Sequence, residues 1–465
     1  MSKVTINENN LKTTTSEKIG YGFAALGDTT GYGLIGVFLL FFLTTIAGIS
    51  PAVAGTIMAV GSVWSAVFNP VMGYFADTIH SKFGKRRLPM FVFCIPMAIS
   101  IFLLFTDLNI PMGVKPVYYG ALLMLYWTFY VGFFVPYNAL GLTYTSDYDD
   151  RTVLRSFVSL FNMFGTMTSM VMPTVLVEMF EGFGFTPAQA WSITGALLGA
   201  VAMIAIIITI IAAKDKDIRE EHYEKTERES FGTTFAAIFR VYFELLKLKP
   251  MKWLVLASLF SLISYAVIMS DIVYYFTYNK GFSSVEISGC LFLRTAIGTA
   301  FIPVINKIII ATDKRETLIG CYIFAVIGMF FVKFVDLGSA EIFIYIFFVM
   351  IATSVYWQIM PGVYYDVCEF DKIVNGQNRS AAIVSFEGLV NGVAAGVGGQ
   401  LLGLILDVAG FDGEAAVQTE TALVWIENAG TILPMIFLVG ACFALYKFPI
   451  NKKTYNKMFE NRPFE

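Results

Sequence analysis

The stretch WSITGALLGAVAMIAIIITIIAAK, from Trp191 to Lys214, runs directly into DKDIREEHYEKTERES, from Asp215 to Ser230. The first stretch has a single charge, at its last residue, and it exceeds the roughly 20 apolar residues that a helix needs to cross about 30 Å of hydrocarbon. The second stretch is too charged to enter lipid and is typical of a solvated linker. The junction therefore predicts a membrane-spanning helix that ends in water.

Apolar stretches of comparable length lie on both sides of this junction. Six precede the linker, at residues 20–48, 53–76, 88–106, 117–145, 153–178 and 188–213. Six follow it, at residues 250–278, 284–311, 317–336, 340–366, 380–407 and 427–448. The chain is therefore expected to be an all-α membrane protein with twelve transmembrane helices. The expected parts are a tail at 1–19, a six-helix bundle at 20–213, a linker at 214–249, a second six-helix bundle at 250–449 and a tail at 450–465.

The composition excludes several other classes of protein. Hydrophobic residues make up 57% of the chain and charged residues 14%, whereas soluble domains carry about a quarter charged residues. The formal net charge of -3 argues against a nucleic-acid partner. The five cysteines lack the paired spacing of a metal or redox site, and both histidines lie in charged segments between spans. Since no nucleotide loop or catalytic triad is evident, we expect no enzyme, no cofactor and no bound metal.

Lysine and arginine residues that flank the predicted spans concentrate on one side of the membrane. The residues on that side are Lys12, Lys18, Lys82, Lys85, Arg86, Arg87, Arg151, Arg155, Lys314, Arg315, Lys372, Arg379, Lys452 and Lys453. The other side has little beyond Lys115 and Lys280. Positive residues beside spans are retained in the cytoplasm. We therefore expect a multi-pass protein of the cell membrane with both termini cytoplasmic and the segment 407–427 external.

The two halves of the chain repeat a pattern after their fourth spans. PYNALGLTYTSDYDDRTVLRS begins at Pro136, and PGVYYDVCEFDKIVNGQNRS begins at Pro361. Each places a proline inside a helix, then aromatic and acidic residues, then an arginine that opens the next helix. This pattern indicates an internal repeat, which is common in membrane transporters.

Four motifs carry a resemblance to a known family. They are NPVMGYFADTIHSKFGKRRLP from Asn69, VPYNALGLTYTSDYDDRTVLRS from Val135, YYDVCEF from Tyr364 and GLVNGVAAGVGG from Gly388. In this order and spacing they resemble the glycoside-pentoside-hexuronide:cation symporter family, the melibiose permease-like branch of the major facilitator superfamily. The resemblance covers nearly the whole chain. It implies a major facilitator fold of two six-helix bundles and the carriage of a sugar, glycoside or uronate by alternating access, together with a coupling cation.

The loop after the second span carries candidate gating residues. Asp77 ends one helix, and Lys85, Arg86 and Arg87 open the next. An acid at a helix C-terminus is unfavourable for the helix dipole, so Asp77 is expected to have a cationic or helix-N-terminal partner and to act as a cytoplasmic latch. An ordinary positive-inside anchor remains an alternative. The candidate partners on the next cytoplasmic loop, which can also be a solvated charged turn, are Asp147, Asp149, Asp150, Arg151 and Arg155.

Charged residues inside the spans are the next candidates. Asp28, Asp271, Arg294 and Glu387 lie in the first, seventh, eighth and eleventh spans. A charge at the bilayer centre costs about 2.5 to 3.5 kcal/mol on insertion scales, so such residues face a cavity or one another. Asp271 and Arg294 are on sequential spans and can form an internal ion pair. Glu387 precedes Asn391 by four residues, so both lie on one helix face.

Several polar and aromatic residues form the expected solute site. The resemblance implies that an acid of the first helix binds sugar hydroxyls, and Asp28 and Thr29 both fit that position. Trp357 in the tenth span can stack on a pyranose ring, although a core aromatic is the commoner role. The remaining candidates for solute binding are Asn138, Ser159, Gln358 and Asn391.

The chain departs from the family pattern at the expected cation site. The two carboxylates of the second helix correspond here to Ser65 and Asn69, and the acid of the fourth helix corresponds to Phe134. A lysine of the eleventh helix and an arginine of the fifth correspond to Asn391 and Ser159. A sodium ion requires hard oxygen ligands, preferably with a carboxylate, so a melibiose-permease-type sodium site is not expected.

Two kinds of coupling therefore remain open. Transport is either coupled to protons, through Glu387 or Asp28, or uncoupled. One alternative solute is an amphipathic or lipid-like molecule, because the family architecture includes lysolipid carriers. An alternative of another class is a membrane receptor that does not transport.

Overall fold

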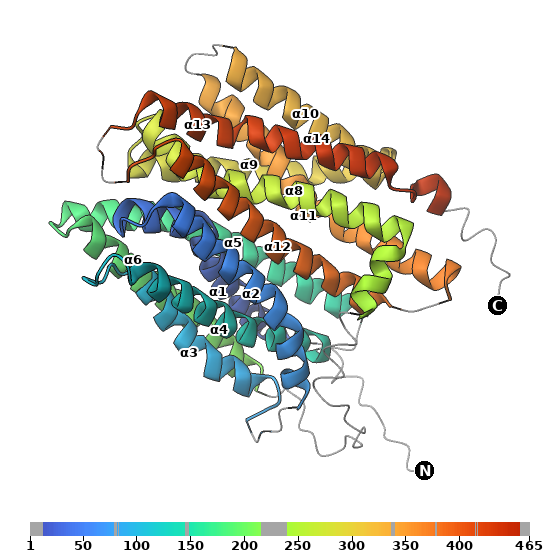
Figure 1. The fold of residues 1–465 in the computed structure, drawn as a ribbon. Coiled ribbons are helices and arrows are strands. Elements are labelled where there is room, and N and C mark those ends of the chain that lie inside the picture. The colour runs from blue at the N-terminus through green and yellow to red at the C-terminus, as the bar shows by residue number, and fades with distance from the viewer. Residues whose placement is uncertain are drawn as a thin grey trace. The chain divides into compact units, whose positions relative to one another are not determined.

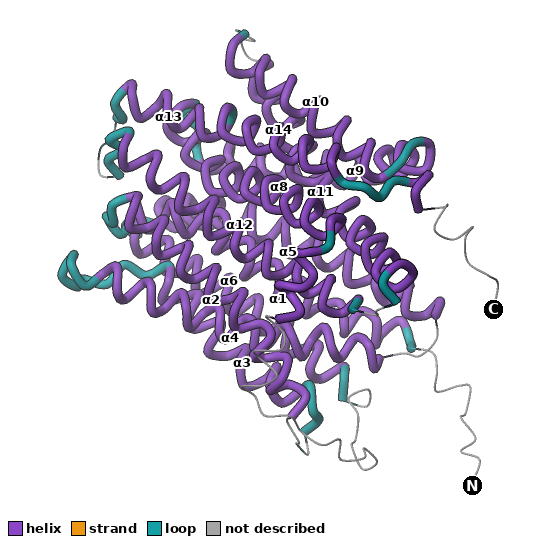
Figure 2. The backbone as a smooth tube through the Cα atoms, turned by 45° about the vertical axis from the view of Figure 1, so that its right-hand side comes forward, coloured by secondary structure: helices purple, strands orange, loops and turns teal. Residues whose placement is uncertain are grey.

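The computed structural model describes residues 13–78, 81, 83–144, 148–214, 240–335, 340–376, 379–413, 415 and 417–455. Within these residues every regular element is helical (Figure 2). The first half contains α1 (Thr15–Phe41), η2 (Phe42–Ile46), α2 (Pro51–Thr78), α3 (Arg87–Leu104), α4 (Lys115–Tyr144), α5 (Tyr148–Gly182) and α6 (Pro187–Ala212). The second contains α8 (Lys249–Tyr274), η3 (Tyr275–Asn279), α9 (Ser284–Ala311), α10 (Lys314–Phe334), α11 (Glu341–Val374), α12 (Ser380–Val408), α13 (Glu420–Gly430) and α14 (Ile432–Lys447).

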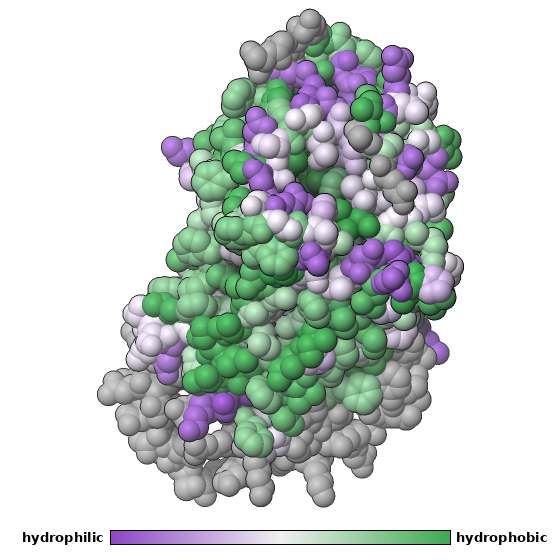
Figure 3. Space-filling model, turned by 90° about the vertical axis from the view of Figure 1, so that its left-hand side faces the viewer, coloured by the Kyte–Doolittle hydropathy of each residue, from purple (hydrophilic) through white to green (hydrophobic). Residues whose placement is uncertain are grey.

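Twelve segments of the described chain are long and apolar enough to cross a membrane. They follow the twelve predicted stretches in order, which confirms the all-α membrane class. Large apolar side chains lie exposed on them, for example Ile310 and Val117 at 75% and 71%, and Figure 3 shows hydrophobic residues over much of one face. Exposed apolar surface of this extent fits contact with lipid. Helices suit this setting because each satisfies its backbone polar groups internally.

The chain divides into two compact units. One consists of Met1–Phe42 with Val67–Glu229, and the other of Leu43–Ala66 with Ser230–Glu465. In the first unit α1 packs on α5 and α6, and α3 packs on α4 and α6. In the second unit α8 is central and contacts α11, α12, α13 and α14 (Figure 1). The expected bundle bounds, 20–213 and 250–449, stay a prediction.

The first part of α2 belongs to the second unit, where it packs closely against α12. A Cβ atom on Gly55 would lie 2.9 Å from the Gly399 carbonyl oxygen, and one on Gly403 would lie 2.9 Å from the Gly55 Cα. Because glycines let two helix backbones approach this closely, larger side chains here would push the helices apart.

Side-chain caps set the starts of three spans. Thr14, Thr186 and Ser283 each form a capping box with the residue three positions on, Glu17, Gln189 and Glu286. Each pair satisfies backbone N–H groups that have no partner within the helix. These helices therefore begin where short polar residues meet the apolar run.

A second likeness between the two halves, separate from the predicted repeat at Pro136 and Pro361, lies at the ends of α1 and α8. α1 continues into the π-helical turn η2 and α8 into η3. A glycine with positive φ follows each turn, Gly48 at 69° and Gly281 at 65°. A positive φ is sterically strained for residues other than glycine. Both glycines therefore allow the chain to turn into the next span, two residues after the π-helical turn in each half.

The last span differs from its prediction. The sequence predicts a single stretch at 427–448, whereas the structure has α13 from Glu420 and a break at Thr431 before α14. Pro434 has no N–H for the carbonyl of Gly430, so the helical ladder is interrupted there. The Tyr345 hydroxyl donates to that carbonyl over 3.4 Å instead.

Candidate functional site

Asp28 lies in the middle part of α1 and meets α4. The hydroxyl of Tyr130 donates to Asp28 Oδ1 over 2.6 Å. Tyr130 is almost fully buried, at 7% exposed, and Asp28 is half-buried. A carboxylate has about four lone-pair sites, so this bond leaves Asp28 able to accept hydrogen bonds from a ligand.

Aromatic rings surround this carboxylate, and we name the group the Asp28 cluster. The ring of Tyr32 lies 5.8 Å from Trp127 and 6.0 Å from Tyr130, and Trp127 lies 5.3 Å from Tyr130. The members of the cluster are Asp28 and Tyr32 of α1 and Tyr126, Trp127 and Tyr130 of α4. Sequence reasoning missed the three α4 aromatics, although YWTFY, residues 126–130, places them within little more than one helical turn.

Thr29 is turned to a different neighbour. Its hydroxyl donates to the carbonyl of Ala25 over 2.8 Å and to that of Asn162 on α5 over 3.3 Å. Gly165 of α5 leaves space for it, because a Cβ atom there would collide with the Thr29 hydroxyl. Thr29 therefore joins α1 to α5, whereas Asp28 lies in the cluster.

Asn138 and Ser159 form hydrogen bonds within their own helices. The Asn138 amide donates to the Phe134 carbonyl over 3.0 Å, and the Ser159 hydroxyl donates to the Arg155 carbonyl over 3.1 Å. Ser159 is exposed and Asn138 is half-buried. Their role in solute binding stays a prediction.

Glu387 of α12 lies beside tyrosines of α11 in the second unit. The phenol of Tyr356 is next to the Glu387 carboxylate, and the phenol of Tyr364 donates to Ser258 of α8 over 3.0 Å. Asn391 lies one turn further along α12 and is half-buried. The coupling candidate Glu387 therefore lies among hydroxyl groups, the chemistry expected along a proton path.

A second group of candidates lies on α11 and its neighbours. Trp357 is 43% exposed, and its ring meets that of Tyr265 edge to face at 5.9 Å. Gln358 has a buried carbonyl oxygen with no hydrogen-bond partner among the described residues. Arg294 of α9 donates to the Thr353 hydroxyl over 3.1 Å and acts electrostatically on Tyr265. These polar groups lie in the C-terminal unit.

The possible ion pair between Asp271 and Arg294 is not formed. Arg294 donates to α11, and neither carboxylate oxygen of Asp271 has a partner within the described part of the chain. The Asp271 side chain is fully buried beside Gly430 of α13. Sequential position on neighbouring spans does not fix the depth or face at which two side chains lie.

Ser65 and Asn69, the predicted coupling residues, lie one turn apart on α2. Ser65 is nearly buried, at 9% exposed, and Asn69 is half-buried. Both offer neutral oxygen atoms. Among the described residues no group of three or more histidine, cysteine, aspartate or glutamate side chains is placed to hold a metal ion.

The gating candidates are only partly described. Asp147 lies outside the described residues, as do the side chains of Asp77, Asp149 and Arg151. Arg87 donates to the Ile210 carbonyl at the end of α6 over 2.7 Å. A cation at a helix C-terminus interacts favourably with the helix dipole. Positive groups beside it are Lys85 and Arg86, and Arg155 acts electrostatically on Tyr21 and Tyr137.

The corresponding end of the second unit has a matching set of contacts. Arg315 donates to the Phe448 carbonyl beyond α14 over 3.0 Å, as Arg87 does at α6. Lys314 pairs with Asp366 at 2.7 Å. Arg379 forms two hydrogen bonds with Asp371, at 2.6 and 2.9 Å, and this carboxylate raises the pKa of the Arg379 guanidinium above its usual value. Bidentate pairing of this kind is strong and directional.

Comparison with known proteins gives consistent matches across the chain. A family model described as "MFS/sugar transport protein" matches residues 20–452. The uncharacterized symporter YnaJ of Bacillus subtilis is 25% identical and covers 98% of this chain and 97% of its own length. The isoprimeverose transporter of Lactiplantibacillus pentosus is 23% identical, over 94% and 89%. The sodium-dependent lysophosphatidylcholine symporter 1-A of Danio rerio is 22% identical, over 91% and 84%.

Solved structures of transporters share the fold. The nucleoside transporter NupG superposes with a TM-score of 0.67 at 14% identity, covering 96% of this chain and all of its own. A D-xylose-proton symporter superposes with a TM-score of 0.61 at 13% identity, covering 92% and 96%. At these identities the likeness concerns the fold alone, and it confirms the expected major facilitator architecture.

Proposed function

Because this chain belongs to the MFS/sugar transport protein family, we propose that it is a symporter for a sugar, glycoside or uronate, working by alternating access. The family consists of transporters, so the chain is a multi-pass membrane transporter and not an enzyme. The class of solute and the coupling ion are our proposal. The location in the cell membrane with both termini cytoplasmic rests on the one-sided lysine and arginine pattern.

The observation that carries the proposal is the Asp28 cluster. A carboxylate with lone pairs to spare can accept hydrogen bonds from two neighbouring hydroxyl groups of a sugar. Tyrosine and tryptophan rings offer flat apolar faces to the C–H face of a pyranose and polar edges to its hydroxyls. Few precisely placed polar groups among aromatics are typical of small-molecule sites, and the similarity to an isoprimeverose transporter supports a sugar-like solute.

Coupling to protons is the second part of the proposal. Glu387 is a carboxylate inside a span, and the second-helix positions Ser65 and Asn69 lack the negative charge that favours sodium. We therefore assign the proton-carrying role to Glu387 and expect no strong dependence on sodium.

An amphipathic or lipid-like solute is the second candidate. One observation favours it, namely the similarity along most of the chain to a lysophosphatidylcholine symporter. A choline headgroup is a quaternary ammonium, which aromatic rings and a carboxylate also bind. The Asp28 cluster is compatible with either ligand, so only a transport measurement separates them.

The test is solute uptake by proteoliposomes that contain the purified protein. Radiolabelled glycosides, uronates and lysophosphatidylcholine are compared, with and without imposed proton and sodium gradients. We expect saturable uptake of at least one glycoside or uronate, stimulated by an inward proton gradient. Uptake of lysophosphatidylcholine alone would replace the proposed solute class by the lipid-like one.

A further inference from the structure

Asp271 is a buried carboxylate that the proposed function does not use. It lies in α8 four residues before the π-helical turn η3, with its side chain fully buried. Neither of its carboxylate oxygens has a hydrogen-bond partner among the residues that the structure describes. An ionised carboxylate without a partner is very unfavourable in an apolar interior. A second charge or a proton is therefore needed to keep Asp271 at this position.

The space around Asp271 is shaped by Gly430 of α13. A Cβ atom at Gly430 would lie 2.7 Å from Asp271 Oδ2 and 2.9 Å from the hydroxyl oxygen of Tyr345. The glycine therefore lets the carboxylate and the Tyr345 phenol of α11 occupy the same small space. This space adjoins the helix break at Thr431.

Two tyrosines in ring contact lie between this space and one end of the second unit. The Tyr345 ring lies 4.8 Å from the ring of Tyr275 in η3. The Tyr275 hydroxyl donates to Glu341 over 2.8 Å, and Lys280 pairs with the same carboxylate at 2.7 Å. Glu341 and Lys280 line a hollow of about 390 Å³.

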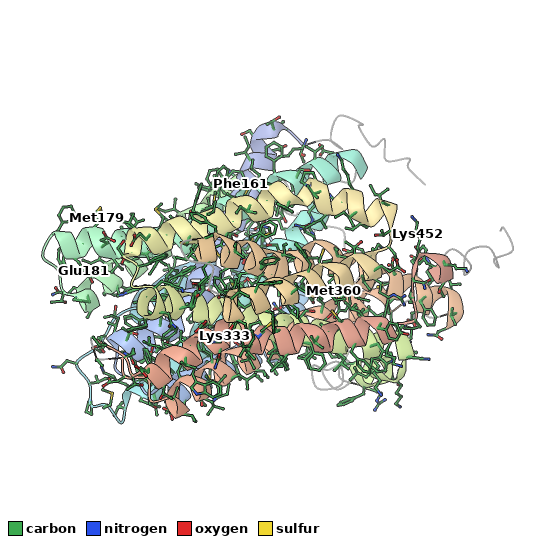
Figure 4. All side chains as sticks on the ribbon, turned by 90° about the horizontal axis from the view of Figure 1, so that it is seen from above. Phe161, Met179, Glu181, Lys333, Met360 and Lys452 are labelled. Atoms are coloured by element: carbon green, nitrogen blue, oxygen red, sulfur yellow. The ribbon has the colours of Figure 1, made fainter. Side chains whose placement is uncertain are left out.

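The other charged groups of that hollow are already paired. Lys333, which Figure 4 labels, forms an ion pair with Glu427 of α13 at 2.9 Å. Asp271 acts electrostatically on the phenols of Tyr345 on α11 and Tyr274 on its own helix. α12 approaches α8 through Gly398 against Ala266, and α14 approaches through Gly440 against Phe260. No cation among these described residues neutralises Asp271.

The repeat within the chain shows that the fold does not require an acid here. Phe38 lies four residues before η2, as Asp271 lies four residues before η3. Phe38 is also fully buried, so the matching position of the other half is an ordinary apolar core position. The acid is therefore a feature added to the second half alone.

We propose that Asp271 is a proton-binding site inside the second unit, loaded from the hollow at Lys280 and Glu341 along Tyr275 and Tyr345. A metal ion is a poor occupant, because hard cations need several oxygen ligands and no group of three or more histidine, cysteine, aspartate or glutamate side chains among the described residues is placed to hold one. The bound proton makes the buried Asp271 carboxyl neutral, so the cost of an unpaired charge in the apolar interior is removed. This site is distinct from Glu387 and does not depend on the class of solute.

Infrared spectroscopy of the purified protein tests this proposal without any transport measurement. A protonated carboxyl group gives a C=O stretching band that shifts when H2O is replaced by D2O. We expect one such band to be lost in Asp271→Asn and to be kept in the matched control Glu387→Gln. Tyr345→Phe should displace the frequency of the same band, because the neighbouring phenol is removed.

Two further measurements keep the result decisive. If Asp271→Asn does not fold, as judged by its melting in detergent, Asp271→Glu is used, and the band is then expected to shift rather than vanish. Exchange of the band with D2O should be slowed several-fold in Tyr275→Phe. A spectrum of folded Asp271→Asn or Asp271→Glu that matches the unmodified protein at every pH would overturn the proposal.

Discussion

Asp28 shows how one carboxylate can be buried in a span and remain available to a ligand. The Tyr130 phenol donates to it over 2.6 Å, and Gly31 leaves room for the Tyr126 phenol beside α1. A phenol stabilises the carboxylate without neutralising it as a lysine or arginine would. A neutral polyhydroxylated solute can then exchange hydrogen bonds with Asp28 without breaking an ion pair.

We expect Asp28→Asn and Tyr130→Phe to weaken solute binding. Hydrogen bonds to charged groups contribute about 1.5 to 3 kcal/mol, and each 1.4 kcal/mol is tenfold in affinity, so KM should rise roughly tenfold or more in Asp28→Asn. The smaller change is expected in Tyr130→Phe, which alters Asp28 only indirectly. Initial uptake rates over a range of solute concentrations measure both.

The matched control is Thr168→Val in α5, whose hydroxyl donates to the Phe164 carbonyl of its own helix over 2.9 Å. Its KM should equal that of the unmodified protein. An unchanged KM in Asp28→Asn would show that the cluster is a packing feature and not the solute site.

Glu387→Gln separates accumulation from exchange. If Glu387 carries the coupled proton, a neutral amide should abolish accumulation driven by a pH gradient, because no proton can be released. Exchange of solute between equal pools should persist, since it needs no net proton movement. Counterflow and gradient-driven uptake in the same proteoliposomes measure the two processes, and retained accumulation would exclude the assignment.

At the scale of the elements, the spans are predictable from sequence and their irregularities are not. Apolar length sets where most helices start and end to within about five residues, whereas α11 ends eight residues after its predicted end at 366 and α13 begins seven residues before the predicted start at 427. The break at Thr431 depends on Pro434 and on the Tyr345 phenol of another helix, and the π-helical turns depend on packing at the ends of α1 and α8. The pairing of Asp28 with Tyr130 likewise depends on how α4 is rotated about its axis relative to α1. This rotation cannot be predicted from a single sequence.

Gly403→Ala tests the close packing of α2 on α12. A methyl group at Gly403 collides with backbone atoms of α2, and overpacking of this kind typically costs about 1 to 3 kcal/mol. The melting temperature in detergent should therefore fall. Gly388→Ala, on the same helix with open space at its Cβ, is the control and should leave the melting temperature equal or slightly higher.

Asp77→Asn tests the latch at the end of α2. We expect transport to fall while expression and melting temperature stay near those of the unmodified protein, because the acid is assigned to a gate contact rather than to core packing. Uptake rates and melting are measured on the same preparations. Normal transport by Asp77→Asn would show that the charged loop after α2 only anchors the helices at the membrane surface.

At the scale of the whole molecule, the four motifs predict the family, and the match to residues 20–452 confirms it. The fold follows from the family and from the twelve apolar stretches. The solute does not follow, because relatives that resemble this chain to a similar degree are named for isoprimeverose and for lysophosphatidylcholine. A difference in solute between such relatives depends on a few side chains around the solute site.

The orientation of the molecule is testable by cysteine labelling. In a variant that lacks the five native cysteines, a cysteine placed at Gly410 should react with an impermeant reagent from outside the cell. One placed at Glu221 should react only after the membrane is opened, since the linker is expected in the cytoplasm. Labelling of position 221 in intact cells would show that the orientation is opposite to the predicted one.

The ion pair between Lys333 and Glu427 also bears on how the chain is inserted during its synthesis. α10 leaves the ribosome before α13, so Lys333 is already in the membrane when Glu427 arrives. A charged side chain within a span opposes insertion, by up to about 2.5 to 3.5 kcal/mol at the bilayer centre, and a waiting partner offsets part of that cost. The final helix is therefore expected to insert more completely when Lys333 is present, and Lys333→Leu should lower the fraction of chains in which the final helix inserts.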